Sequence, residues 1–315
     1  MTEQVIAATL FGCVGCQAGV ELLQTKIKDS INLLTFCSFI FTATYGLISH
    51  AKFFTVRNKI PLRSYVVIVV IFFVINLCNN YAMKFDVHIP LFIIFKSGSL
   101  FANIILGKIL RGFQYTAKQQ FAVTVVTIGI VIFTLASYEP DTTEKVTKTM
   151  KIGGFVISQF IIGICLLTIA LFLSAYLGLY QEMFYQKHGK HNEEMMFYVH
   201  LLSIPAFILV GNEMSFAWKA ANESPNFEIL GISIGIPSAW VYIAGINFLQ
   251  FICTRNVYRM SSVTSSLNVT MVLTLRKFLS LVISFWVFDN PFNYFHIFGA
   301  VFVFLGSFIF SISSI

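Results

Sequence analysis

Apolar residues in this chain gather in ten long runs that are separated by short polar segments. A helix rises about 1.5 Å per residue, so a run of about twenty apolar residues can cross the hydrocarbon core of a bilayer. The pattern therefore predicts an all-α membrane protein with ten transmembrane helices. The predicted spans are Val5–Leu22, Ile31–Phe53, Tyr65–Met83, Ile89–Leu110, Gln120–Tyr138, Gly153–Tyr180, Met195–Gly211, Ile232–Cys253, Thr264–Phe288 and Phe292–Ser313.

The polar segments between these runs are too short for a separate soluble domain. The two longest, Tyr138–Lys151 and Asn212–Glu228, are predicted to be loops. With both termini in the cytosol, the cytosolic loops carry 11 Lys and Arg residues and the opposite loops carry 7. The positive-inside rule favours this orientation. We therefore expect one multi-pass domain, residues 1–315, with cytosolic termini.

Composition supports a membrane protein. Hydrophobic residues make up 57% of the chain and charged residues only 11%, more apolar side chain than a soluble domain of this length can bury. The formal net charge of +7 comes from residues scattered through short loops, so we expect no nucleic-acid partner. The cysteines all lie in apolar runs and are interpreted as small packing residues. They are Cys13, Cys16, Cys37, Cys78, Cys165 and Cys253.

An internal repeat is visible in the apolar runs. Gly, Ile, Phe and hydroxyl positions coincide between Ile128–Ser137 and Leu305–Ser314, each at the end of a half. One span earlier, both halves contain Lys-x-x-Ser-Leu, beginning at Lys96 and Lys277. A five-helix repeat must lie upside down relative to its twin. We therefore predict two inverted repeats, residues 1–138 and 153–315, with a substrate site near the midplane and transport by alternating access.

Three cations lie in the interior of predicted spans rather than near their ends: Lys96, Arg276 and Lys277. Each costs about 2.5–3.5 kcal/mol at the centre of a membrane helix on insertion scales. No predicted span has an acidic residue in its interior, since Glu21 and Glu182 lie at span ends. We therefore expect an anionic ligand to supply the negative charge. The alternative for Lys96 is a side chain that extends to the membrane surface.

Polar and aromatic residues accompany these cations on the third, fourth, seventh and ninth spans. Aromatic rings can stack on a nucleobase, and amides and hydroxyls can bond to a sugar. For the third span the alternative is a cap at the membrane interface. The pair His188 and His191 lies in a charged loop, so we predict no metal and no cofactor. The candidate substrate-binding residues are Lys277, Lys96, Arg276, Tyr198, Phe197, His200, Asn268, Ser266, Asn80, Tyr81, Ser99 and Ser280.

Five segments together resemble the nucleotide-sugar transporters. Within that family they look most like the branch of UDP-xylose/UDP-N-acetylglucosamine transporters in solute carrier family 35, subfamily B. The matching segments are Phe95–Gly107, Asn79-Asn-Tyr-Ala82, Gln181-Glu-x-x-Tyr185 with Gly189-Lys-His191, Phe197-Tyr-x-His200 and Thr274-Leu-Arg-Lys-Phe278.

The resemblance implies the ten-span drug/metabolite-transporter fold in a Golgi or endoplasmic reticulum membrane. It implies that a cytosolic nucleotide sugar is exchanged for lumenal UMP, and that UDP-N-acetylglucosamine, UDP-xylose or both are carried. The choice of sugar, the choice of organelle and the formation of a homodimer stay open. Membrane lipid is the other expected partner, and no enzymatic activity is expected.

By position in the family, Phe197 and Tyr198 correspond to the base-binding motif. The polar ninth span through Lys277 corresponds to the sugar- and phosphate-binding motif. This chain has Val199 where relatives often carry Asn, and its ninth span lacks the Gly-Ala-Leu-Asn-Lys form of the GDP-mannose branch. Uridine is therefore the expected base, and GDP-sugars are not expected.

Two rival functions follow from the same residues. A sugar-phosphate or other anionic-metabolite exporter of the same fold would share the cations but need no base pocket. A membrane-embedded transferase acting on lipid-linked sugars would need an acidic or metal-binding site at a membrane face. The clustered acids Glu193 and Glu194, with His191, lie in one loop, which argues against the transferase.

Overall fold

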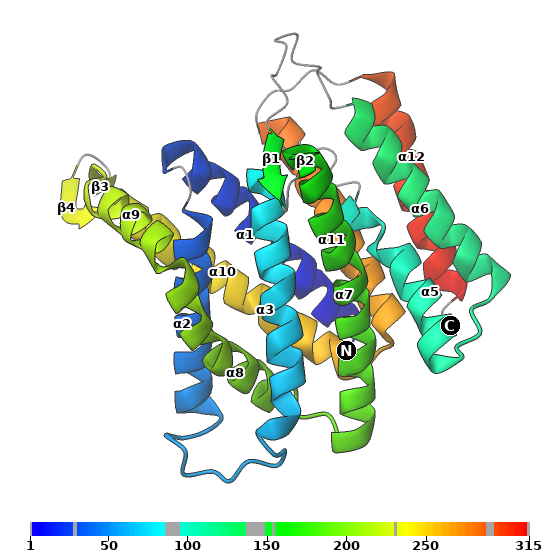
Figure 1. The fold of residues 1–315 in the computed structure, drawn as a ribbon, viewed down its shortest axis with the longest axis horizontal. Coiled ribbons are helices and arrows are strands. Elements are labelled where there is room, and N and C mark those ends of the chain that lie inside the picture. The colour runs from blue at the N-terminus through cyan, green and yellow to red at the C-terminus, as the bar shows by residue number, and fades with distance from the viewer. Residues whose placement is uncertain are drawn as a thin grey trace. The chain divides into compact units, whose positions relative to one another are not determined.

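The computed structural model describes residues 2–27, 30–85, 95–136, 149–152, 155–229, 232–287 and 293–313. Most of these residues are helical (Figure 1). The helices are α1 (Thr2–Lys26), α2 (Ile31–Ser49), α3 (Arg63–Lys84), α5 (Ser99–Arg111), α6 (Ala117–Ala136), α7 (Gln159–His188), α8 (Asn192–Ser203), the 3-10 helix η1 (Ile204–Val210), α9 (Gly211–Asn222), α10 (Ser238–Ser261), α11 (Ser266–Val287) and α12 (Tyr294–Ser313). Two antiparallel hairpins join β1 (Thr149–Ile152) to β2 (Phe155–Ser158) and β3 (Asn226–Ile229) to β4 (Ile232–Pro237).

Each of the ten predicted spans contains a helix, but three regions differ from the prediction. The starts of the sixth and eighth predicted spans are the strands β2 and β4. The seventh span changes from α8 to η1 at Ile204, because Pro205 has no N–H to continue the α-helical bonds. The predicted loop Asn212–Glu228 is mostly helix α9, whose Ala217 and Ala221 face the core one turn apart.

Among the described residues, five helices are long and apolar enough to cross a membrane. They are Gln4–Leu23, Ile31–Ser49, Ala117–Ala136, Gln159–His188 and Tyr294–Ser313. The pair Asn192–Leu209 and Met214–Asn222 also passes when taken together, with a bend of 95°. The protein is thus a helical membrane protein with several spans, as the apolar pattern predicted. The ten-span arrangement and the inverted repeat stay predictions.

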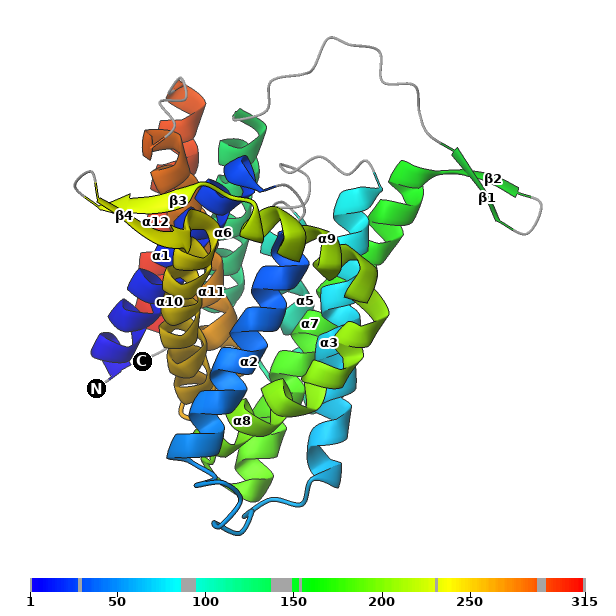
Figure 2. The same cartoon turned by 90° about the vertical axis from the view of Figure 1, so that its left-hand side faces the viewer.

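The first compact unit comprises residues 1–69, 184–264 and 279–284. In it, α10 lies between α1 and α2, and α8 packs on α2 (Figure 2). Gly12 and Gly19 of α1 bring that helix close to Ile252 and Ile246 of α10. A disulfide bond joins Cys13 to Cys253 and ties the same two helices together. The interpretation of all six cysteines as simple packing residues was therefore wrong for this pair.

The second compact unit comprises residues 70–183, 265–278 and 285–315. Helices α6 and α12 run side by side in both views (Figures 1 and 2). Gly129 and Gly299 permit this approach, since a Cβ atom on either would lie 2.8 Å from the other's carbonyl oxygen. Phe133 of α6 packs edge-on against Phe278 of α11 and His296 of α12. This packing fixes the part of α11 that carries the predicted cations.

Candidate functional site

Lys277 and Lys96 meet in the second unit. Residues 95–97 form a short helical stretch that is interrupted at Gly98, and α5 begins at Ser99. The interruption leaves the Lys96 carbonyl available to side chains. The Ser99 hydroxyl donates to it at 2.8 Å, and the Lys277 ammonium donates to it at 3.2 Å. Two residues that the sequence predicted from the repeated Lys-x-x-Ser-Leu pattern are therefore neighbours in space.

The three predicted cations form one positive cluster, defined here as Lys96, Arg276 and Lys277. Lys96 and Arg276 are both near enough to Lys277 to act on it as like charges. Each side chain is partly accessible, neither fully buried nor exposed. The next residue, Phe278, is buried against Phe133 at a ring-centroid distance of 5.2 Å. Packing of Phe278 thereby fixes the rotation of α11, and with it the direction of the adjacent lysine.

A second polar group holds the start of α11 in the same unit. The Glu182 carboxylate of α7 accepts the backbone N–H of Ser266 at 2.8 Å, which neutralises the positive end of the helix. The Asn103 amide donates to Ser266 Oγ at 2.7 Å and to Thr270 Oγ1 at 3.2 Å. Burial and the negative charge of Glu182 raise the pKa of the nearby Tyr115 phenol to about 12. Ser266 is thus engaged in fixing α11.

The remaining polar candidates are dispersed. Asn268 lies in the first turn of α11 and is partly buried, and Ser280 is buried on the same helix. Tyr81, near the end of α3, is 40% exposed. The side chain of Asn80 lies outside the described residues.

The three aromatic candidates on α8 lie in the first unit, and two of them are core residues. Phe197 is completely buried against α2, where a Cβ on Gly46 would come 2.6 Å from its ring. His200 is also buried, bonds through Nδ1 to the Met196 carbonyl at 2.7 Å and packs edge-on against Phe39. The sequence predicted an accessible aromatic face here. The close contact at Gly46 turns Phe197 inward instead.

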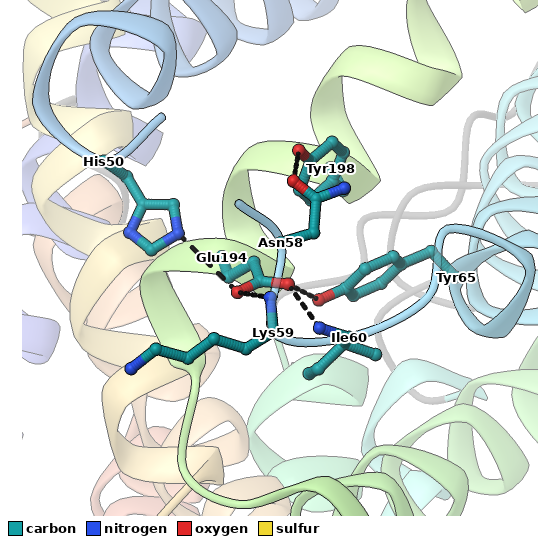
Figure 3. Close-up of polar contacts among 7 residues, drawn as sticks. All are labelled: His50, Asn58, Lys59, Ile60, Tyr65, Glu194 and Tyr198. Atoms are coloured by element: carbon teal, nitrogen blue, oxygen red, sulfur yellow. Dashed lines mark hydrogen bonds and ion pairs between the residues drawn. The ribbon is translucent and has the colours of Figure 1, made fainter. Parts of the chain in front are cut away.

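Tyr198 is held by Asn58 of the loop between α2 and α3 and by Tyr65 in the first turn of α3. Its ring stacks on the Tyr65 ring, with centroids 5.3 Å apart and planes at 26°. Its hydroxyl donates to the side-chain carbonyl of Asn58. Only 4% of Tyr198 is exposed. Figure 3 shows Tyr198 together with Asn58 and Tyr65.

Glu194 is a buried carboxylate that was not among the site residues predicted from the sequence. It is 1% exposed and accepts the backbone N–H groups of Lys59 at 3.2 Å and Ile60 at 3.0 Å (Figure 3). It also accepts the Tyr65 hydroxyl at 3.1 Å, and His50 Nε2 lies 3.8 Å away. The sequence placed Glu194 in a charged loop. Its position one helical turn before Tyr198 is the signal that could have revealed a shared face.

No metal centre emerges from the described residues, among which no three His, Cys, Asp or Glu side chains are grouped to hold an ion. His188 instead packs on Phe184 at a centroid distance of 4.8 Å, and Glu193 pairs with Arg255 at 2.8 Å. His188 is therefore engaged in packing and Glu193 in an ion pair.

The chain is similar to known transporters along nearly its whole length. The UAA transporter family matches residues 3–314. The UDP-xylose and UDP-N-acetylglucosamine transporter of Danio rerio is 38% identical over 95% of this chain and 91% of its own. The endoplasmic reticulum GDP-fucose transporter of Drosophila melanogaster is 39% identical over 98% of this chain and 90% of its own. The nucleotide sugar transporter SLC35B4 of Homo sapiens is 36% identical over 94% of this chain and 89% of its own.

Two further points follow from these similarities. A crystal structure with 12% sequence identity superimposes over 98% of both chains with a TM-score of 0.67, which shows a shared fold. The Drosophila protein is named for GDP-fucose, although it is as similar to this chain as the Danio protein. The expectation that GDP-sugars are excluded, which rested on Val199 and the ninth-span pattern, therefore loses its support.

Proposed function

Because the chain belongs to the UAA transporter family and is a nucleotide-sugar transporter rather than an enzyme, we propose that it exchanges a UDP-sugar for UMP by alternating access. UDP-N-acetylglucosamine and UDP-xylose are the proposed substrates, since the similar Danio rerio protein is named for both. The proposed membrane is that of the endoplasmic reticulum or Golgi, since the family resemblance implies one of the two and the Drosophila relative is named for the endoplasmic reticulum. Both termini are proposed to face the cytosol, from the distribution of Lys and Arg among the loops.

The positive cluster is the observation that carries the proposal. Lys96, Arg276 and Lys277 repel one another at a place where each side chain is only partly accessible. A diphosphate that enters this cluster relieves the repulsion and forms charge-assisted hydrogen bonds with the ammonium and guanidinium groups. A neutral sugar would neither relieve the repulsion nor form charge-assisted hydrogen bonds. The cluster therefore supports an anionic substrate in which the phosphates, rather than the sugar, supply most of the affinity.

The same electrostatics favour exchange over one-way transport. Closing the protein around an empty cluster would remove several like charges from water at once, which is costly. A bound nucleotide neutralises those charges and lowers the cost of closure. The empty carrier would then reorient slowly and the loaded carrier quickly. Obligate exchange follows from this difference without coupling to an ion.

The ten-span arrangement with two inverted repeats is part of the proposal. Support comes from α6 and α12, which the sequence predicts to be the last helices of the two repeats. Gly129 of α6 and Gly299 of α12 contact each other reciprocally. Reciprocal packing is expected of equivalent helices related by a pseudo-twofold axis. The proposed UMP counter-substrate, lipid contacts and homodimer rest on the family resemblance.

Uptake into liposomes containing only the purified full chain tests the proposal. Vesicles preloaded with UMP should accumulate radiolabelled UDP-N-acetylglucosamine or UDP-xylose about tenfold faster than vesicles without UMP, since only loaded carriers reorient readily. GDP-fucose is the necessary comparison because of the Drosophila relative. Equal uptake into loaded and empty vesicles would remove the exchange mechanism. Uptake of GDP-fucose but not of either UDP-sugar would show that the recognised base is guanine rather than uracil.

A further inference from the structure

The loop between α2 and α3, residues 51–62, has an unusual backbone. Lys52, Phe53 and Phe54 are three consecutive non-glycine residues with positive φ, at 43°, 56° and 62°. Side chains disfavour this left-handed region, so such a stretch persists only where its surroundings hold it. The two phenylalanine side chains are 68% and 61% exposed, and the centroid of the Phe54 ring lies 6.0 Å from that of the Phe197 ring of α8. Backbone hydrogen bonds hold this stretch at the end of α2, from the Phe53 N–H to the Leu47 carbonyl at 2.9 Å and from the Val56 N–H to the Ala51 carbonyl at 3.3 Å.

The other end of the loop is held by α8. Glu194 binds two successive backbone N–H groups at the far end of the loop, those of Lys59 and Ile60. Tyr198, one helical turn later, binds the Asn58 side chain. Ile60 is buried beneath these contacts. The loop is thus fastened across the first turns of α8 by a single carboxylate and a single phenol (Figure 3).

The fastened loop has a consequence for Tyr198. One face of its ring is covered by Tyr65, and Tyr65 is itself bonded to Glu194. With 4% of Tyr198 exposed, a planar base has no room to stack on the ring while the loop stays in place. Contact between Tyr198 and a nucleotide therefore requires the loop and Tyr65 to move away together. Both are held by Glu194.

We propose that residues 51–62 form a lid over Tyr198, that Glu194 is the positioning residue that latches it, and that nucleotide binding releases the latch. The ligand-dependent half of this inference rests on the proposed function, whereas the latch itself does not. A closed lid that must open before binding lowers the apparent affinity by the fraction of open molecules. Weakening the latch should therefore tighten nucleotide binding, which is the opposite of what a purely structural residue would do.

Tryptic cleavage of the detergent-purified full chain measures lid opening. Arg57 and Lys59 lie exposed in the lid, and cleavage after them requires the backbone to leave Glu194. Glu194→Gln keeps the size of the side chain but replaces one carboxylate oxygen with an amide N–H₂ group. That group is a donor and cannot accept a backbone N–H. We expect cleavage after Arg57 and Lys59 to accelerate about tenfold, because proteolysis follows the population of the open form. Glu193→Gln is the matched control, since its neighbouring carboxylate pairs with Arg255 and should leave cleavage unchanged.

Binding of UMP supplies the second measurement. UMP should accelerate cleavage of the wild-type lid, whereas inorganic phosphate should not. The dissociation constant for UMP should fall in Glu194→Gln by the same factor by which cleavage rises. If Glu194→Gln fails to fold, Tyr198→Phe removes only the bond to Asn58 and should give a smaller rise in cleavage. In both variants, the melting temperature without ligand reports whether the fold is intact.

The outcomes separate the lid from the proposed function. If UMP does not raise the melting temperature of the wild-type protein, the proposed function fails, and the ligand-free cleavage rates still decide whether Glu194 is a latch. If UMP binds but leaves lid cleavage unchanged or slows it, the lid is overturned. If Glu194→Gln binds UMP more weakly, with cleavage unchanged, Glu194 is structural and the latch is overturned.

Discussion

The ammonium group of Lys277 donates a hydrogen bond to the main-chain carbonyl of Lys96, a residue 181 positions earlier in the chain. This bond joins α11 to the helical break before α5. It places the Lys277 charge beside this carbonyl at the helical break and near the like charges of Lys96 and Arg276. In membrane transporters, binding sites are typically formed by interrupted helices with polar groups at the break. The first prediction concerns this lysine.

Replacing Lys277 with alanine should abolish exchange of nucleotide sugar for UMP. The substitution removes the charge proposed to bind phosphate, and removing a cation from a membrane helix should ease insertion. Initial uptake into UMP-loaded liposomes should fall about a hundredfold, as expected when a charged hydrogen bond of about 3 kcal/mol is lost. The matched control is Lys187→Ala, an exposed lysine in the last turn of α7. Wild-type uptake by the Lys277 variant would remove the phosphate role.

Part of this site was predictable from the sequence. The repeated Lys-x-x-Ser-Leu pattern indicated equivalent positions for Lys96 and Lys277, and the two residues are in contact. Polar residues in an apolar segment are costly, so their presence alone marks them for attention. The inward rotation of Phe197 was not predictable, because it depends on the absence of a side chain at Gly46 on another helix. The role of Glu194 depends likewise on a distant loop.

The helices were predicted more reliably than the segments that join them. Apolar runs located a helix in each of the ten ranges, since lipid imposes length and polarity on a span. Helix α9 was missed because its sequence is polar on average, although Ala217 and Ala221 repeat at the spacing of one turn. The disulfide between Cys13 and Cys253 joins residues 240 positions apart. Sequence alone cannot pair such distant cysteines.

The glycine contact between α6 and α12 should be sensitive to a single methyl group. In Gly129→Ala the new Cβ would lie 2.8 Å from the Gly299 carbonyl oxygen, so the helices must separate. Overpacking of this kind typically destabilises by about 1–3 kcal/mol. The melting temperature in detergent should therefore fall. Gly245→Ala on α10 is the control, because its Cβ meets nothing within 4 Å and alanine favours a helix. Equal melting temperatures for both variants would contradict the close packing.

The disulfide can be tested by thiol labelling. Cys13 and Cys253 should resist maleimide in denatured, unreduced protein and react after reduction, because a disulfide sulfur is not nucleophilic. Cys165 is exposed and unpaired by a disulfide, so it should react in both conditions. Cys253→Ser should release Cys13 for labelling without a reductant. Peptide mass spectrometry identifies each labelled site, and modification of wild-type Cys13 before reduction would contradict the bond.

The order in which ligands protect the protein against heat should identify what it recognises. A ligand that binds only the folded state stabilises it by RT ln(1 + [L]/Kd), or about 2.7 kcal/mol at a hundredfold excess over Kd. UMP and UDP-sugars should protect far better than uridine, because their phosphates bind to the positive cluster. Uridine should protect better than free N-acetylglucosamine, which lacks both phosphate and base. The measurement is the melting temperature of the purified chain with each ligand.

Two variants test whether this order arises from recognition of the phosphate and of the base. Lys277→Ala should abolish the advantage of UMP over uridine, since the phosphate loses its partner at the cluster. Tyr198→Ala should instead reduce discrimination between uridine and adenosine nucleotides, since the stacking ring is lost. GMP belongs in the series because a 39% identical relative is named for GDP-fucose. Protection by GMP above UMP would reassign the base to guanine. Protection by inorganic phosphate equal to that by UMP would favour a sugar-phosphate exporter and remove base recognition from the proposed function.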